Sequence, residues 1–434
     1  MCNYSTKQRG LAQAIWPLFC FLPAMLPYKA ASAAVENPSV TVDRILLKSI
    51  LAQGRINLRG RQVDLTPAKG ETYNRTTKRV IRRSDGRCLS ICLDSHDKPV
   101  SVHMDDGRIT RDYDVHSRTI TTAHSMPTVR TEVEAHRIAR RILSNYRVRL
   151  VRSDSIASRP CFVLELDARD PQSHSLIVWI DKETGTTLSR EENDRKGGST
   201  LGLTLFTDVA FPGEIKDSDV QYKFPRSAKV TPLSLSPRFK DLQPLRPRAG
   251  FPLFQPISMP FGFEFESCEM VRFSGIPTAC LRYSDGVAVI NVFEAKARDP
   301  VPPSNAQITY RALPRGESLA MVQLDRTMCV VMGGRTVEGT VMIARSLDVE
   351  DARSKLNGLA RTFNVPEPVL MNMRNQGCGL DCIAAILEIS AQTRKTVQSV
   401  FWMHRQGWQW PSIAQQLRAN VRTVSNRVKP YECR

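Results

Sequence analysis

Residues 161–211 read CFVLELDARDPQSHSLIVWIDKETGTTLSREENDRKGGSTLGLTLFTDVAF and contain three strand-like runs in succession. Apolar residues alternate with less apolar ones over 162–166 and again over 201–205, while 176–180 is apolar on both faces. Period-two alternation predicts strands with one buried face. Turn-forming residues separate the runs, at Asp170-Pro171, at Asp181–Gly185 and at Gly197-Gly198. The stretch therefore predicts an antiparallel meander.

The rest of the chain extends this pattern. Helical spacing is found at 42–53 and 132–145, and short strand-like runs fill 55–123 between them. Helices segregated to one side of a long meander indicate an α+β fold, and such a sheet curls so that two helices can plug its concave face. We expect this first domain to span residues 36–222.

Three further segments follow. Residues 223–256 are rich in proline and predict a linker over the surface or between domains. Residues 257–346 predict a second, β-dominated α+β domain, and 347–434 show repeated helical spacing.

The first 34 residues predict a cleaved signal peptide. Lys7 and Arg9 precede an apolar run over 11–26, and small residues follow at 31–34. The alternative is an amino-terminal membrane anchor, but the run is short and interrupted by proline. We expect an exported, periplasmic or otherwise extracytoplasmic, soluble protein.

The formal net charge of the chain is +18, of which the first 34 residues contribute three. In an exported protein this favours anionic lipid head groups, and so peripheral membrane contact, or an acidic partner segment. A general basic bias would produce the same number.

The cysteines predict neither a disulfide scaffold nor a metal site. The pairs Cys88/Cys92 and Cys378/Cys382 are four residues apart, which is not the CxxC spacing of metal ligands. Cys268 and Cys280 flank a predicted hairpin turn and form a candidate disulfide, with buried free thiols as the alternative. No catalytic set or phosphate-binding loop is found, so we expect no enzyme activity, no cofactor and no metal.

Two phrases in the right order carry a family resemblance. Ile177-Val178-Trp179-Ile180-Asp181-Lys182-Glu183-Thr184-Gly185 with Phe206-Thr207-Asp208 resembles the amino-terminal domain of the RseB/MucB regulators of sigma-E. Met259–Phe263 with Tyr283–Phe293 (YSDGVAVINVF) resembles their carboxy-terminal domain. The resemblance implies a LolA/LolB-like half-open antiparallel barrel with plugging helices, followed by a smaller domain; it covers about residues 40 to 345.

The resemblance implies binding and no catalysis. The partner would be the extracytoplasmic segment of a membrane-bound anti-sigma factor in an envelope stress response, and the signal would be a lipid or lipoprotein. A curled sheet whose concave face is incompletely plugged suits acyl chains. The candidate lipid-binding residues are Leu176, Val178, Trp179, Ile180, Leu203 and Leu205, with core packing as the alternative for Trp179. A LolA/LolB-like carrier of lipid or lipoprotein is the second hypothesis.

The tail holds a competing signal. Residues 411–429 match the spacing of a helix-turn-helix, with Arg418 where a turn glycine is usual. A DNA-binding regulator is therefore the third hypothesis. The export signal makes nucleic acid an unexpected partner and favours a helical cap or docking bundle.

Overall fold

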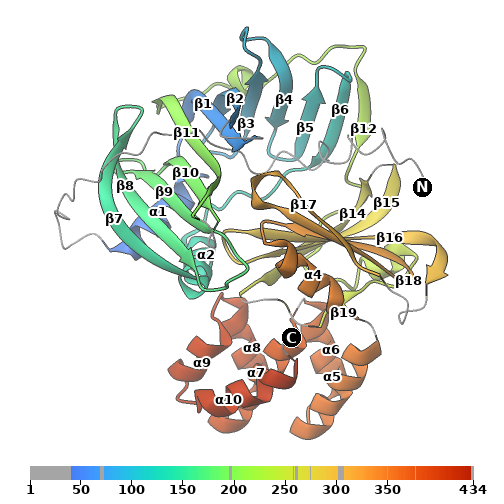
Figure 1. The fold of residues 1–434 in the computed structure, drawn as a ribbon. Helices are drawn as coiled ribbons and strands as arrows, with labels where there is room; N and C mark the ends of the chain where they lie inside the picture. The colour runs from blue at the N-terminus through green and yellow to red at the C-terminus, as the bar shows by residue number, and fades with distance from the viewer. Residues whose placement is uncertain are drawn as a thin grey trace.

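The computed structural model describes residues 41–68, 73–194, 198–257, 259, 262–273, 275–301, 307–348, 350–376 and 378–431. The predicted signal peptide lies outside these residues. Two β-sheets and a group of helices are arranged as shown in Figure 1.

The first sheet is long and open. Its strand order is β12-β6-β5-β4-β3-β2-β1-β11-β10-β9-β8-β7. Neighbouring strands are antiparallel, except that β12 runs parallel to β6. The predicted meander forms β8, β9 and β11; β10 is a fourth strand, between β9 and β11, which the sequence pattern did not predict. Strand β11 returns to pair with β1. The strands are β1 (Leu58–Pro67), β2 (Tyr73–Arg82), β3 (Cys88–Leu93), β4 (Pro99–Asp105), β5 (Ile109–Asp114), β6 (Thr119–His124), β7 (Tyr146–Ile156), β8 (Arg159–Ala168), β9 (Ser175–Asp181), β10 (Thr187–Asn193), β11 (Thr200–Ala210) and β12 (Lys229–Pro232).

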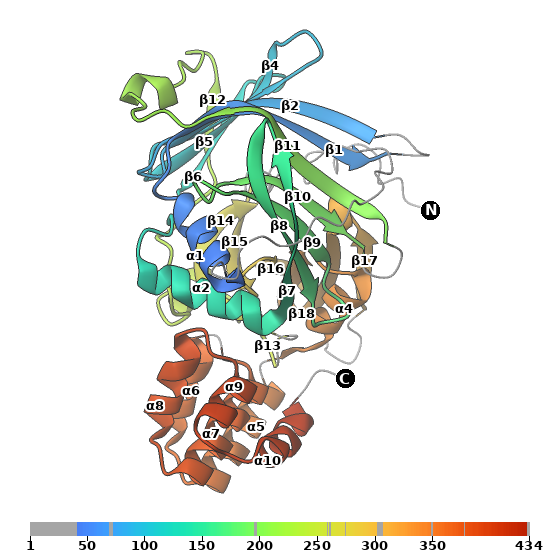
Figure 2. The same ribbon diagram turned by 90° about the vertical axis from the view of Figure 1, so that its left-hand side faces the viewer.

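Helices α1 (Val42–Ala52) and α2 (Glu132–Asn145) lie side by side against one end of this sheet (Figure 2). Their apolar residues recur at helical spacing, so each buries one stripe. Ile45, Leu46 and Ile142 pack with Leu164 of β8 and Ile180 of β9. The Thr131 hydroxyl accepts a hydrogen bond from the Glu134 amide and so begins α2. The predicted sheet with plugging helices is therefore confirmed.

The proline-rich segment after the first sheet is built into both sheets. Within it, β12 extends the first sheet, followed by the short helix α3 (Arg246–Ala249) and β13 (Gln255–Pro256). Leu242 and Leu245 are fully buried in the core of the second sheet. This segment is thus a packed connection, because its few apolar residues have a core to enter.

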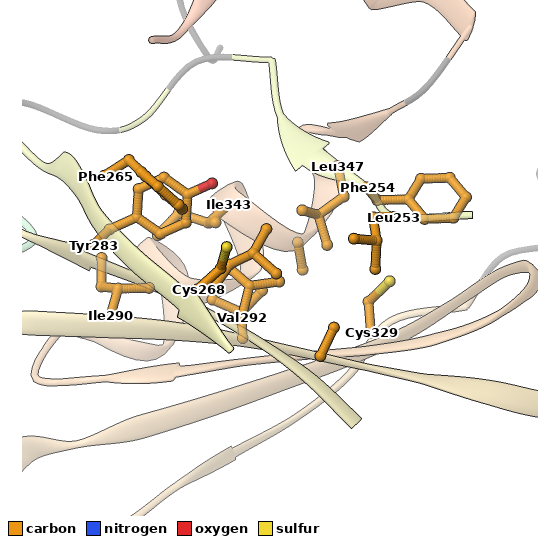
Figure 3. Close-up of a cluster of buried hydrophobic side chains, with 14 of the residues drawn as sticks. Leu253, Phe254, Phe265, Cys268, Tyr283, Ile290, Val292, Cys329, Ile343 and Leu347 are labelled. Carbon is orange, nitrogen blue, oxygen red and sulfur yellow. The ribbon is translucent and has the colours of Figure 1, made fainter. Parts of the chain in front are cut away.

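The second sheet has the order β14-β15-β16-β18-β17 and carries α4 against it. Its elements are β14 (Glu264–Phe273), β15 (Ile276–Ser284), β16 (Val289–Val301), β17 (Thr309–Ala312), β18 (Ser318–Gly333) and α4 (Val337–Arg345). Figure 3 shows its core, in which Phe265, Tyr283 and Ile290 of the sheet lie toward Ile343 of α4, and Leu347 lies beside Leu253 and Phe254. Leu347 belongs to β19 (Leu347–Asp348), which pairs with β13.

The remaining helices form a bundle below both sheets (Figure 1). Helix α7 is its centre: nine of its residues are buried, including Ile383, Ile386 and Ile389, which are fully buried. The helices are α5 (Glu350–Phe363), α6 (Glu367–Asn375), α7 (Leu380–Thr393), α8 (Val397–Arg405), α9 (Trp410–Gln416) and α10 (Val421–Val428). The predicted α+β class with a helical extension is confirmed. Across the described part of the chain, every helix is too short or too polar to cross a membrane.

Candidate functional site

The turn Ser284-Asp285-Gly286 joins the second sheet to the first. Asp285 Oδ1 accepts hydrogen bonds from the amides of Val287 and Ala288, which shape the turn. Its Oδ2 accepts a hydrogen bond of 2.8 Å from the Tyr146 hydroxyl. The side-chain Nδ2 of Asn145 donates to the Asp285 backbone carbonyl at 2.8 Å. Burial raises the pKa of the Asp285 carboxyl, and the hydrogen bonds oppose that rise. The phrase that carried the family resemblance is therefore a docking element.

Two ion pairs reinforce this contact. Arg335, only 1% exposed, pairs with Asp170 at 2.5 Å and donates to the Ser173 hydroxyl at 3.3 Å. Arg141 of α2 pairs with Glu264 at the start of β14. Because unpaired buried charges are costly, these pairs hold the two sheets in one arrangement.

The six candidate lipid-binding residues fall on one wall, β9 to β11, but do not gather in one place. Leu176, Val178 and Ile180 pack beneath α1 and α2. Trp179 lies in a separate cluster with Leu58 and Phe206. Leu203 and Leu205 pair in register with Leu65 and Val63 of β1. Three of the six therefore already have helical side chains as neighbours.

Trp179 has polar contacts of its own. Its indole nitrogen donates to Asp154 Oδ2 at 2.9 Å, and the Arg152 guanidinium lies 5.8 Å from the ring centre. A buried indole whose N–H is satisfied within the fold fits a packing role.

The candidate Cys268–Cys280 disulfide is not formed. In the β14–β15 ladder Cys268 pairs with Leu281, and Cys280 pairs with Glu269. Side chains alternate between faces along a strand, so the two thiols point to opposite sides. Cys268 lies in the core covered by α4, and Cys280 packs with Phe293 on the other face. Both are free thiols, which is the alternative that the sequence analysis gave to a disulfide.

The helical bundle holds a cluster that the spacing argument missed. Cys378, Cys382 and His404 are all buried, and one potential ligand atom of each lies within 4.8 Å of the other two. Hydrogen bonding with Cys382, followed by the His404 imidazole, lowers the pKa of the Cys378 thiol against the effect of burial. A signal was present: residues four apart share a face where a helix begins. The position of His404 beside them depends on the packing of α8 against α7.

The tail forms two helices, α9 and α10, joined by a turn. Arg418 stands in this turn with φ of 59°, the left-handed conformation that glycine adopts most readily. Val424 and Val428 of α10 are buried in the bundle core. The pattern at 411–429 thus forms part of the bundle.

A basic face covers part of β1 and β2 and consists of Arg59, Arg61, Arg75 and Arg79. Arg61 and Arg79 are directly opposite each other in the ladder, and like charges in that position repel. Arg61 is compensated by Asp97 at 2.8 Å. Arg75 and Arg79 are exposed, and neither forms an ion pair within the described part of the chain. Two uncompensated cations therefore remain on β2.

Comparison with known proteins adds a family and a fold. Residues 91–224 match the MucB/RseB N-terminal domain. No curated protein matches the chain.

A chain of the Pseudomonas aeruginosa MucA/MucB complex is 20% identical, with a TM-score of 0.50 over 71% of this chain and 98% of that one. A chain of the crystal structure of MucB in complex with MucA(peri) is 19% identical, with a TM-score of 0.50 over 71% and 99%. At these identities the likeness to the solved structures concerns the fold. The match over residues 91–224 confirms the resemblance to the MucB/RseB N-terminal domain read from residues 177–185 and 206–208.

Proposed function

We propose that this protein is an exported, non-enzymatic regulator that binds the extracytoplasmic segment of a membrane-bound anti-sigma factor. The observation that carries the proposal is the extent of the structural likeness. Nearly the whole length of a chain from a MucA/MucB complex is matched, and both sheets are docked through buried contacts such as Tyr146 to Asp285. A binding protein needs such a fixed arrangement if its partner contacts more than one part of it.

The basic face supports an acidic partner segment. Arg75 and Arg79 are exposed and form no ion pair within the described part of the chain, so an anionic segment would supply the opposite charge that they lack. Electrostatic complementarity of this kind raises association rates and is weakened by salt.

The binding test uses the mature protein and a synthetic peptide spanning the extracytoplasmic segment of an anti-sigma factor from the same genome. We expect saturable binding with a dissociation constant below about 10 μM. If none of the anti-sigma segments encoded in that genome binds the protein, the proposed partner is excluded.

Charge reversal tests whether the basic face is the surface that binds the acidic segment. R75E/R79E should weaken binding at least tenfold at low salt and reduce its salt dependence. The matched control R226E/R326E changes the same number of exposed arginines elsewhere and should leave binding unchanged. Equal loss in both double variants would show that net charge matters and the basic face does not.

Lipid sensing is the finer part of the proposal. An acyl chain reaching Leu176, Val178 and Ile180 would have to displace α1 or α2, because these side chains pack together. Ligand entry would then loosen the packing of α1 and α2, and α2 also carries the docking residues Arg141 and Asn145. This links lipid binding to release of the partner.

A photoreactive fatty acid tests this route. We expect crosslinks to α1, α2 or β9, and faster amide hydrogen exchange in α1 when the fatty acid is bound. Crosslinks confined to the bundle, or a mass spectrum without bound lipid at saturating fatty acid, would remove lipid from the proposal and leave the partner untouched.

A further inference from the structure

Cys378, Cys382 and His404 form a preassembled set of metal-ligand side chains. Their three candidate ligand atoms lie within 4.8 Å of one another, and all three residues are buried. In a tetrahedral zinc site with bonds of about 2.3 Å to sulfur and about 2.0 Å to nitrogen, ligand atoms are separated by roughly 3.3 to 3.8 Å. Small side-chain rotations bring the observed group into that range.

The two cysteines are held at the start of α7. Cys382 is the third residue of the helix, and Cys378 precedes its N-cap, Gly379. Arg374 donates to the Cys378 carbonyl at 3.0 Å, and the Leu380 amide donates to the Ile257 carbonyl at 2.7 Å. These bonds fix the backbone where α7 begins, so both cysteines lie at the positive end of the helix, which favours the thiolate that binds metal.

His404 is oriented in the manner of a metal ligand. It lies near the end of α8, and its Nδ1 is 3.0 Å from the Trp408 carbonyl oxygen. A carbonyl can only accept, so Nδ1 carries the proton and donates, and the lone pair of the neutral ring is then on Nε2. A hydrogen bond from the second ring nitrogen to a carbonyl accompanies most histidine ligands, because it sets the tautomer and the ring orientation.

We propose that Cys378, Cys382 and His404 bind a thiophilic metal ion of the Zn²⁺ or Cu⁺ class. Two thiolates and one imidazole suit soft or borderline ions, and hard ions such as Mg²⁺ and Ca²⁺ prefer oxygen. With Zn²⁺, two thiolates balance the charge of the ion, which suits a buried position. The thiol protons are released on binding.

The site links three parts of the molecule. The start of α7 is tied to the β13 segment, since Arg374 donates to the Pro256 carbonyl at 2.6 Å. The residues after His404 contact α2 of the first sheet. Arg140 donates to the Gln406 carbonyl at 3.2 Å and lies 5.1 Å from the Trp408 ring centre. The metal would therefore fasten the bundle where it meets both sheets.

The test uses the full-length mature protein, reduced and stripped of metal by a chelator. Zn²⁺ is titrated against a chromophoric chelator, Cu⁺ is titrated anaerobically, and Co²⁺ serves as the spectroscopic probe. We expect one equivalent of Zn²⁺ or Cu⁺ per chain and a thiolate-to-cobalt charge-transfer band. The ratio of the two affinities identifies the ion.

Variants assign the ligands. C378S, C382S and H404A should each weaken binding at least tenfold, while the matched control C92S, a half-exposed cysteine on β3, should not. H404C keeps a ligand and should bind Co²⁺ with a stronger charge-transfer band, which a merely structural histidine would not produce. On metal removal, amide hydrogen exchange should rise at residues 404–408 and in the facing part of α2.

Three outcomes would overturn the proposal. These are no stoichiometric binding by the reduced wild type, unchanged affinity in all three ligand variants, and a Cys378–Cys382 disulfide in the protein isolated from exporting cells. Binding of the anti-sigma segment is measured separately, so either proposal can fail alone.

Discussion

The Tyr146 hydroxyl donates a 2.8 Å hydrogen bond to Asp285 Oδ2 across the contact between the two sheets. Each residue is only 2% exposed. Tyr146 begins β7 directly after α2, and Asp285 lies in the turn between β15 and β16. One bond thus connects the helix that plugs the first sheet with the hairpin of the second.

Removing this donor should destabilise the fold. In Y146F the carboxylate keeps its buried position and loses one partner, at a cost of about 1–3 kcal/mol in the free energy of unfolding. Urea denaturation of Y146F and wild type measures this change in the free energy of unfolding. The control Y310F removes a hydroxyl from a tyrosine that is 65% exposed and should change little. Equal stability of Y146F and wild type would show that the bond contributes nothing.

Replacing Arg335 should be more costly. R335M leaves Asp170 without its buried cation, and breaking such a pair costs about 3–5 kcal/mol. The double variant D170N/R335M should recover part of the loss, since no charge is left unpaired. The exposed-arginine control R311M should stay within about 0.5 kcal/mol of wild type. A double variant that is less stable than R335M would contradict the prediction. It would show that the loss in R335M does not come from the unpaired charge of Asp170.

The turn at Gly286 should not tolerate a side chain. Its φ is +100°, and a Cβ there would lie 3.0 Å from Ile142 Cγ1 of α2. We expect G286A to lose about 1–3 kcal/mol of stability, from backbone strain together with crowding of the sheet contact. G213A adds the same methyl group where nothing lies within 4 Å and should be nearly neutral. Thermal unfolding of both variants checks this, and matching melting temperatures would contradict it.

His103 should make stability fall at high pH. Burial disfavours its charge, but hydrogen bonds with Asp112 and Cys88 outweigh burial and raise its pKa from 6.5 to about 10. The folded state thus binds the proton more tightly than the unfolded state. The stabilisation is complete below pH 6.5 and is lost as the pH rises toward about 10. Denaturation across this window should show the decline in wild type and a flatter profile in H103Q. The control H96Q alters an exposed histidine and should keep the decline.

Local sequence patterns predicted much of the fold. Alternation over 162–166 and 201–205 became β8 and β11, and helical spacing at 42–53 and 132–145 became α1 and α2. These predictions succeed because strand and helix periodicity depend on near neighbours. The Cys268–Cys280 bridge failed because it depended on register. A shift of one residue in the β14–β15 ladder sends the thiols to opposite faces.

The candidate sites show the same division. The YSDG phrase at 283–286 indicated a hairpin and a family, but its docking onto Tyr146 depends on two segments that are 139 residues apart. Cys378 and Cys382 were visible as a pair, while His404 joined them only through the packing of α8 on α7.

The sequence by itself therefore determined most of the elements, their order, the α+β class and the family resemblance, since each depends on the spacing of nearby residues. Only the tertiary structure decided which side chains meet: Tyr146 with Asp285, Arg335 with Asp170, and two cysteines with His404. Those contacts follow from how the hydrophobic faces of whole elements pack, and such packing is set by the entire chain at once.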